Sequence, residues 1–234
     1  MKILSLDSSA TVASVALCEN EKLLAEYTVN NGNTHSETLL PMVKDVLDNF
    51  SLTPKDIDLF AVSNGPGSFT GVRIGVATLK GLAFSSDKPC VGVSTLEALA
   101  LNLSGYTGLI CPVMNARRSQ VYTALFRSDG EHIERLMPDS AISIDELDVI
   151  LSEYAEAVRF CGDGYDITVG ALTKTTAIHV PERERHQSAY SVAVTALREL
   201  NGRKATTDAE LKVTYLRPSQ AERELNNKNK NKEV

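Results

Sequence analysis

The sequence contains no tryptophan, and both aromatic residues and cysteines are scarce. Its four cysteines are widely spaced and form no C-x-x-C pair: Cys18, Cys90, Cys111 and Cys161. This spacing argues against a disulfide framework or a thiolate zinc site, and it predicts reduced, mostly buried thiols in a cytoplasmic protein. No apolar run approaches the roughly 18 residues that span a membrane. The opening MKILSLDSS alternates and has an early aspartate, unlike the core of a signal peptide.

An excess of basic residues is also missing. The chain has 24 Lys and Arg residues against 30 Asp and Glu residues, a net charge of −6. A strong general affinity for nucleic acid is therefore not expected, while a local basic patch stays open. Apolar residues make up 43% of the 234 positions. This length and composition predict a globular chain of one large domain or two of about 100 residues.

Glycine is concentrated in one stretch, 64–75, which reads NGPGSFTGVRIG. Apolar residues precede the stretch and follow it at helical spacing, so the pattern predicts a strand, a sharp turn and a helix. The turn is not a P-loop, because it lacks the Gly-Lys-Ser/Thr ending. One interpretation is an anion site, in which backbone N–H groups and Arg73 face a phosphate. The other is close packing along one helix face, formed by Gly71, Gly75, Thr78 and Leu82.

The first 30 residues predict three strands joined by turns. Asp7 stands at the end of the first strand, beside two serines. Its carboxylate can face a metal or a phosphate, or it can hydrogen-bond the backbone of its own turn. The local pattern favours the second interpretation. A helix is predicted over 35–50, behind a Thr34–Glu37 capping box. His35 has no second ligand at usable spacing, so a capping or surface role is expected for it.

The pattern of the first 30 residues restarts after the segment 104–108, which has two glycines and no periodicity. Aligning the two halves places Asp7 on Asn115, and the shared order of elements indicates an internal duplication. We therefore expect two α/β domains, each with a mixed sheet and flanking helices. Their expected bounds are 1–104 and 105–218, followed by a flexible polar tail over 219–234.

These motifs resemble the TsaB family of bacterial threonylcarbamoyladenosine-biosynthesis proteins. The resemblance runs from residue 1 to about residue 217. It rests on ILSLDSS, HSETLLP and NGPGSFTGVRIG, and more weakly on NARRSQVYTALF and VTYLR. It implies the fold of the actin, sugar-kinase and heat-shock-protein superfamily (ASKHA, RNase H-like), with two actin-like domains. The family pattern usually has acids where Asn115 and Gln120 stand, so the roles of these two side chains stay open.

The resemblance also implies a role in tRNA modification. TsaB is similar to TsaD, which transfers threonylcarbamoyl to the adenosine 3′ of the anticodon in tRNAs reading codons that start with A. Where TsaD holds a metal with an HxxxH pair, this chain has Thr95 and Leu99. Leucine cannot ligate a metal, and a lone threonine hydroxyl is a poor ligand. The chain thus resembles a pseudoenzyme subunit with no catalytic residue or cofactor of its own, in a complex that uses ATP and a metal ion.

TsaD is the partner that the resemblance implies, with TsaE as a further component and tRNA reached through the complex. A homodimer is implied for the chain alone. The expected partner face lies on the helices near 35–50 and 71–84, although such stripes also face their own domain. Its residues are Leu39, Val43, Leu47, Gly71, Val72, Gly75, Thr78 and Leu82. The residues expected at a nucleotide or anion site are Asp7, Ser8, Gly67, Ser68 and Arg73.

Two rival functions can be weighed on the same residues. An ATP-dependent small-molecule kinase of the superfamily would use Asp7 to face Mg–ATP. No second carboxylate is placed as its base, and Asn115 stands where the duplication predicts an acid. A peptidase is disfavoured further, because the sequence has no HExxH motif, no serine nucleophile in a recognisable elbow, and only scattered histidines.

Overall fold

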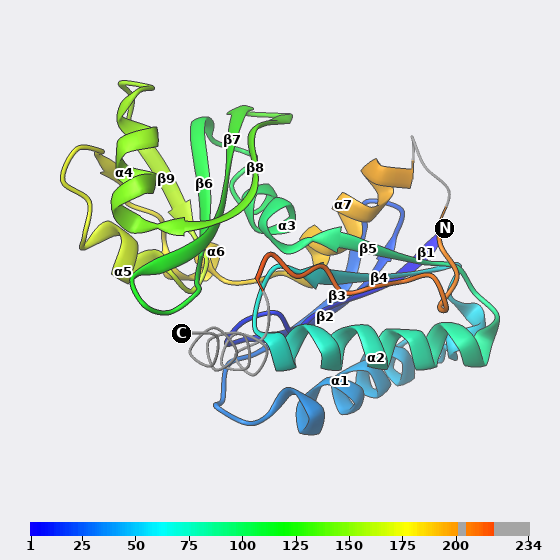
Figure 1. The fold of residues 1–234 in the computed structure, drawn as a ribbon. Coiled ribbons are helices and arrows are strands. Elements are labelled where there is room, and N and C mark those ends of the chain that lie inside the picture. Colours follow the sequence, from blue (N-terminus) through cyan, green and yellow to red (C-terminus); the bar gives the residue numbers. More distant parts are fainter. Residues whose placement is uncertain (201–204, 218–234) are drawn as a thin grey trace, which may run out of the picture.

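The computed structural model describes residues 1–200 and 205–217. These residues form two lobes, each built on one five-stranded sheet (Figure 1). The expected tail over 219–234 lies outside the described residues. Within the described part of the chain, no helix is long and apolar enough to cross a membrane. The two sheets confirm the α/β class and the mixed strand directions expected from the sequence.

The first lobe has strand order β3-β2-β1-β4-β5, with β1 antiparallel to β2 and parallel to β4. Its strands are β1 (Lys2–Asp7), β2 (Ala13–Glu19), β3 (Lys22–Val29), β4 (Leu59–Gly65) and β5 (Cys90–Ser94). Strands β1, β2 and β4 are almost wholly buried, because helices cover both faces of the sheet there.

Helices α1 (His35–Asn49) and α2 (Phe69–Ser86) run side by side over one face of the first sheet (Figure 1). The turn η1 (Pro54–Asp56) follows α1. Pro41 lies inside α1 on its exposed side. The predicted Thr34 capping box is wrong: the Thr34 hydroxyl donates to the Glu37 carboxylate at 2.8 Å and caps no backbone N–H. Ser68 does cap α2, accepting the Gly71 N–H at 3.3 Å.

The second lobe repeats the topology of the first, with order β10-β9-β6-β7-β8. Its central strand β6 is antiparallel to β7 and parallel to β9, as β1 is to β2 and β4. The strands are β6 (Thr107–Asn115), β7 (Gln120–Asp129), β8 (Ile133–Ser143), β9 (Val158–Cys161) and β10 (Ala177–Ile178). This shared order confirms the duplication, and it places Asp7 and Asn115 at the ends of equivalent strands.

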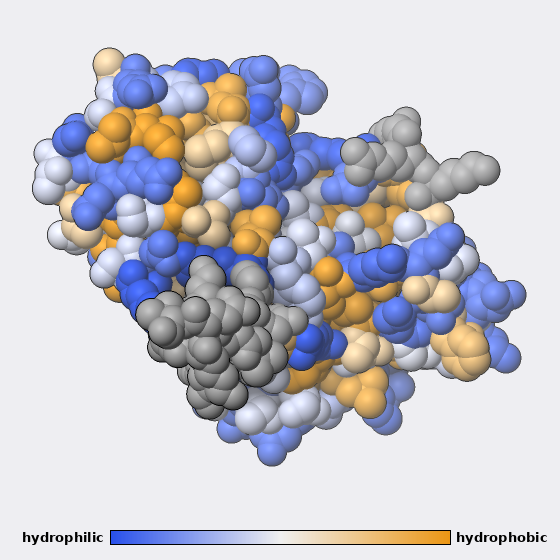
Figure 2. All heavy atoms as spheres, in the orientation of Figure 1, coloured by the Kyte–Doolittle hydropathy of each residue, from blue (hydrophilic) through white to orange (hydrophobic). Residues whose placement is uncertain are grey.

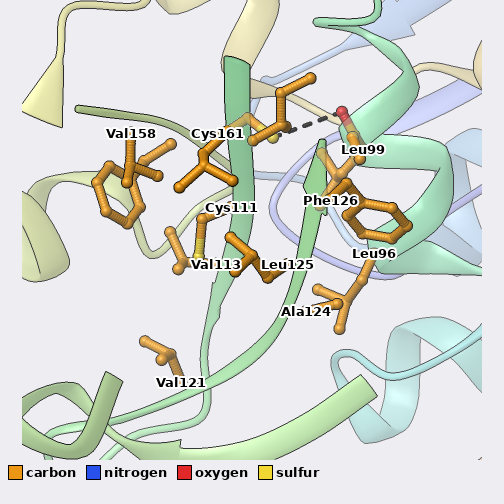
Figure 3. Packing of buried hydrophobic residues seen from close by; sticks show 14 of the residues in the cluster. Leu96, Leu99, Cys111, Val113, Val121, Ala124, Leu125, Phe126, Val158 and Cys161 are labelled. Carbon is orange, nitrogen blue, oxygen red and sulfur yellow. Dashed lines mark hydrogen bonds between the residues drawn. The ribbon is translucent and has the colours of Figure 1, made fainter. Parts of the chain in front are cut away.

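Apolar side chains from α3 (Thr95–Leu101), β6, β7 and β9 interdigitate in the core of the second lobe (Figure 3). Leu96 and Leu99 pack from α3, and the Cys161 thiol lies 3.4 Å from the Leu99 carbonyl oxygen. Burial of such side chains contributes about 2 kcal/mol each. All four cysteines are free and buried, which confirms their predicted burial. Helices α4 (Ile144–Ser152), α5 (Tyr165–Val169) and α6 (Glu182–Arg185) complete this lobe.

The chain returns to the first lobe after α6. Helix α7 (Ala189–Leu200) packs on β1, β2 and β4, on the side of the sheet opposite α1 and α2 (Figure 1). The Ser5 hydroxyl donates to the Ala189 carbonyl at 2.6 Å, and the Ala189 N–H donates to Ser14 at 3.0 Å. The expected unit 105–218 therefore supplies a helix to the first lobe, and the boundary near residue 104 stays a prediction.

Residues 205–217, here called the strap, then run along the edge strand β5 of the first sheet and reach the second lobe. Thr206 pairs with Cys90 at the edge strand, and the Thr214 N–H donates to the Asn64 carbonyl at 2.8 Å. Arg217 donates to the Ala116 carbonyl at 3.3 Å and to the Gln120 side chain. The strap thus links the glycine turn of the first lobe to the β6–β7 turn of the second.

Candidate functional site

A cavity of about 570 Å³ lies where the two lobes and the strap meet. Five segments line it: the β1–β2 loop, the glycine turn with the start of α2, the β6–β7 region, the turn after β9, and the end of the strap. Its polar and aromatic lining residues are Ser9, Thr11, Ser68, Phe69, Thr70, Asn115, Arg117, Tyr122, Asp163, Thr214, Tyr215 and Arg217. This volume is in the range of small-molecule and cofactor sites.

Asp7 does not line this cavity. Its carboxylate is 1% exposed and accepts the Ser9 N–H at 2.8 Å, the Ser9 hydroxyl at 2.6 Å and the Ser63 hydroxyl at 2.5 Å. Burial raises the pKa of Asp7, and these hydrogen bonds oppose the rise. The bond to the Ser9 N–H confirms the turn-bonding interpretation. A side chain enclosed in this way is poorly placed to face a metal or a phosphate.

Only two of the five residues expected at an anion site, Gly67 and Ser68, line the cavity. Ser8 is buried and donates to the Gly71 carbonyl at 2.9 Å. Arg73 is exposed, lies 3.6 Å over the Phe69 ring and donates to the Tyr215 hydroxyl at 2.6 Å. The glycine turn therefore has a packing role, while Arg73 lies outside the cavity and contacts two of its walls.

Close packing explains why glycine is needed at the start of α2. A Cβ at Gly71 would collide with the Ser8 carbonyl oxygen, and one at Gly75 would lie 2.6 Å from the Ser8 hydroxyl. A Cβ at Gly67 would lie 2.5 Å from the Ser9 carbonyl oxygen. These contacts let the helix approach the β1–β2 loop of its own lobe, which is the packing interpretation of the sequence.

Asp163 is a cavity residue that sequence reasoning missed. It follows β9 in the Gly-Asp-Gly turn, and it accepts the Asn115 N–H at 3.1 Å. Burial raises its pKa, an effect that this hydrogen bond and the nearby His186 oppose. The Gly162-Asp163-Gly164 sequence is typical of a turn at the end of a strand. Its proximity to Asn115 follows from the parallel pairing of β6 with β9, which no local pattern encodes.

Asn115 and Gln120 stabilise the β6–β7 turn. The Asn115 side chain accepts the Arg117 N–H at 2.8 Å, and Gln120 accepts from Arg217. Arg117, Arg118 and Ser119 all have positive φ, between 55° and 63°. Three such residues in succession make a strained turn, and strain of this kind is often kept at functional sites. The turn holds two arginines beside the cavity.

The predicted partner-face residues lie mainly in the chain's own core. Leu39, Val43, Leu47, Gly71, Val72 and Gly75 are buried, while Thr78 and Leu82 are partly exposed. Sequence reasoning thus selected the inward stripe of each helix, because amphipathicity does not distinguish a core face from an interface. The outward surface of the same helices carries other residues: Leu40, Thr70, Ala77, Gly81 and Phe84. Hydrophobic atoms are visible over this region of the surface in Figure 2.

Thr95 and Leu99 are both buried in the described structure. The Thr95 hydroxyl has no hydrogen-bond partner there, and Leu99 belongs to the core of the second lobe. No group of three His, Cys, Asp or Glu side chains able to hold a metal occurs among residues 1–200 and 205–217. The position of the HxxxH pair is therefore occupied by core packing.

Comparisons with known proteins place this geometry in context. Residues 22–224 match the model of a family described as "TsaD: tRNA N6-adenosine threonylcarbamoyltransferase". The chain is 38% identical over 162 residues to the Bacillus subtilis "tRNA threonylcarbamoyladenosine biosynthesis protein TsaB", covering 69% of this chain and 71% of the relative. It is 36% identical over 136 residues to the Escherichia coli protein of the same description, covering 57% and 58%.

Solved structures agree with these sequence relationships. A structure described as "YeaZ from Pseudomonas aeruginosa" superposes with a TM-score of 0.78 at 25% identity, covering 92% of this chain and 99% of that one. A second, described as "an uncharacterized protein with similarity to peptidase YEAZ" from the same organism, gives a TM-score of 0.79 at the same identity and coverage. Together with the two repeated sheets, these superpositions confirm the expected two-lobed actin-like α/β fold.

Proposed function

Because the chain belongs to the TsaB family of tRNA threonylcarbamoyladenosine biosynthesis proteins, we propose that it takes part in threonylcarbamoylation of tRNA. It acts as a non-catalytic cytoplasmic subunit that binds TsaD, favours the competent form of TsaD and works with TsaE. The modified base is the adenosine 3′ of the anticodon in tRNAs that read codons starting with A. The chain contributes coupling free energy to the complex, and the complex uses ATP and a metal ion.

Leu99 carries the non-catalytic part of this proposal. It is 1% exposed within the core of the second lobe, at the position where the sequence resemblance puts a metal-binding histidine. A buried isobutyl group has no lone pair for a metal, and its surroundings leave no room for one. TsaD then carries out the chemistry on tRNA, and this chain acts by binding TsaD.

The outward surface of α1 and α2 is the face proposed for TsaD. Phe84 is 77% exposed and Leu40 is 55% exposed, which is unusual for large apolar side chains. Between them α2 presents small residues, Ala77 and Gly81, that let another helix approach closely. The same face accounts for a homodimer when TsaD is absent, since an uncovered apolar surface favours self-association.

A charge on this face tests the partner assignment. Ala77→Glu adds a carboxylate to an exposed position in the middle of α2, so we expect the fold to survive and TsaD binding to weaken at least tenfold. The control is Val149→Glu on α4, which adds the same charge to an exposed apolar site of the second lobe. Affinities would be measured by titration calorimetry with purified TsaD. Equal affinities for both variants would place the interface elsewhere.

An omission experiment tests the function itself. Synthase, TsaD, TsaE, ATP, threonine, bicarbonate and unmodified tRNA are combined with and without this chain, and modified adenosine is counted by mass spectrometry. We expect product only when the chain is present, and none from the chain without TsaD. Product that forms equally well in its absence contradicts the proposal.

The alternative function is an ATP-dependent small-molecule kinase, and the structure offers one observation against it. The kinase would need Asp7 to face a metal–nucleotide complex, yet its two oxygens are engaged by Ser9 and Ser63 below the surface. Turnover of ATP by the isolated chain that Asp7→Ala abolishes would restore the kinase as the better reading.

A further inference from the structure

Eight of the described arginines fall into two groups according to their partners. Arg127, Arg135, Arg183 and Arg185 each pair with a carboxylate, and none of the four lines the cavity between the lobes. The second group lies at or beside that cavity and has no carboxylate partner among the described residues: Arg73, Arg117, Arg118 and Arg217. Two further described arginines, Arg159 and Arg198, do not line the cavity, and Arg159 donates to the Thr107 carbonyl. In a chain with a net charge of −6, the second group still gathers four positive charges without a carboxylate partner at one place.

The partners that these arginines do have are neutral. Arg73 lies against Phe69 and donates to the Tyr215 hydroxyl, and Arg217 donates to a carbonyl and an amide oxygen. Arg117 and Arg118 are exposed. Hydrogen bonds to neutral acceptors orient a guanidinium without cancelling its charge. Such groups stay available to an anion that reaches the cavity.

One acid, Asp163, lines the cavity beside these arginines. Burial raises the pKa of its carboxyl group, and the Asn115 N–H, which donates to it at 3.1 Å, opposes the rise. A ligand with several negative charges therefore meets four arginines and one acid at this opening.

Aromatic rings accompany the arginines. Phe69, Tyr122 and Tyr215 all line the cavity, from α2, β7 and the strap. The Phe69 and Tyr215 ring centroids are 5.0 Å apart, and the Arg217 guanidinium lies 6.0 Å from the Tyr122 ring centre. Proteins that bind single-stranded nucleic acid combine aromatic rings, on which bases stack, with arginines, which bind the phosphates.

The arrangement suits a chain of phosphates better than one compact phosphate group. The arginines come from three separate segments, namely α2, the β6–β7 turn and the strap. Arg117 and Arg217 line the cavity, and Arg73 and Arg118 lie beside it. The cavity of about 570 Å³ is large enough for a base together with its sugar. Successive phosphodiesters on either side of that base would meet different arginines.

We propose that the cavity between the lobes binds single-stranded RNA, with one base among Phe69, Tyr122 and Tyr215 and flanking phosphates at the four arginines. The proposal rests on the proposed function in one respect, which is that an unpaired stretch of the tRNA is the natural source of this RNA. Recognition is through phosphates and stacking, so little sequence preference is expected.

The test is fluorescence anisotropy of a labelled 10-nucleotide single-stranded RNA titrated with the full chain. The double variant R117A/R118A removes two phosphate contacts, so the slope of log affinity against log salt should shrink by about 1.4. Tyr122→Leu keeps an apolar side chain but loses the ring, and it should weaken binding about tenfold. The control is Arg183→Ala, whose side chain is 86% exposed and pairs with Glu184 away from the cavity.

Three outcomes overturn the proposal. The first is RNA binding that is undetectable at millimolar concentrations. The second is an equal loss of RNA affinity in R183A and in R117A/R118A, because binding would then depend on positive charge anywhere on the surface. The third is displacement of the RNA by ATP with an affinity equal to or tighter than that of the RNA, which would assign the cavity to a free nucleotide.

The binding experiment uses the chain alone, without TsaD, so its result is independent of the omission experiment. A chain that binds RNA but proves dispensable there contradicts only the proposed function.

Discussion

Asp148 illustrates how one enclosed carboxylate can stabilise a loop. It is 3% exposed, and its oxygens accept the N–H groups of Thr173, Lys174 and Thr175 at 2.7–2.9 Å. Burial alone would raise the pKa of Asp148, but these bonds and two threonine hydroxyls outweigh it and lower the pKa to about 2. A lowered folded-state pKa means that the charged carboxylate stabilises the fold above about pH 4, where the unfolded chain ionises.

We expect Asp148→Ala to lower the free energy of unfolding by about 2–4 kcal/mol near pH 7, because three N–H groups lose a charged acceptor. The difference from the wild type should shrink as the pH falls from about 4 through about 2, since the wild-type carboxylate then becomes protonated. Urea unfolding of the variant and the wild type between about pH 7 and about pH 2 measures the loss of stability and its dependence on pH. Glu153→Ala, at the exposed end of the same helix, is the control. A difference that stays constant down to pH 2 would contradict this account.

At the residue scale, the sequence supports some assignments and not others. The Asp7 turn could be predicted because Asp-Ser-Ser at a strand end encodes a local hydrogen bond. The engagement of Asp7 by Ser63 could not, since 56 positions separate the two residues and only strand pairing joins them. The cavity role of Asp163 was missed for the same reason.

At the scale of elements, α2 shows what a helix sequence reveals and what it conceals. Its start, its length and its row of small residues follow from local spacing. Local spacing does not show which side of the helix faces the core and which faces a partner. Gly75 was expected on the partner face, yet Gly75→Leu would place a side chain against Ser8 and disturb the core.

Two glycines of α2 give a matched prediction. Gly71→Ala should destabilise the chain by at least about 2 kcal/mol, because its Cβ collides with the Ser8 carbonyl oxygen and the backbone must shift. Gly81→Ala, in the same helix, meets nothing within 4 Å and should stabilise it by up to about 1 kcal/mol through helix propensity. Thermal and urea unfolding of both variants decide the matter. Similar effects at the two positions would show that packing on the β1–β2 loop is unimportant.

At the scale of the whole molecule, the duplication could be predicted from the sequence, but the return of α7 and the strap to the first lobe could not. Repeated strand order leaves a trace in the sequence, because each copy needs the same alternation of strands and turns. The strap has no counterpart in the first half, and it docks through contacts across more than 100 residues, such as Thr206 with Cys90. Helix α7 follows the last strand of its half, as α3 does, and each of the two packs on the sheet of the other lobe.

The strap provides a prediction about the two lobes. Arg217→Ala removes the hydrogen bonds that join the strap to Ala116 and Gln120, so we expect the β6–β7 turn to exchange its amide hydrogens about tenfold faster. Amides in the centre of each sheet should keep their wild-type rates. The control is Arg159→Ala, which loses a bond to Thr107 within one lobe. Unchanged exchange at the turn would mean that the strap does not hold the lobes together.

The position of α7 bears on the order in which the protein can be made. A ribosome completes every strand of the first sheet well before it completes the helix that covers one face of that sheet. Until residues 189–200 emerge, the nascent chain exposes Ile3, Ala16 and Leu59, which pack on this helix in the folded protein. The first lobe therefore completes its fold only near the end of translation, and a gene truncated at the apparent boundary should yield an aggregation-prone fragment.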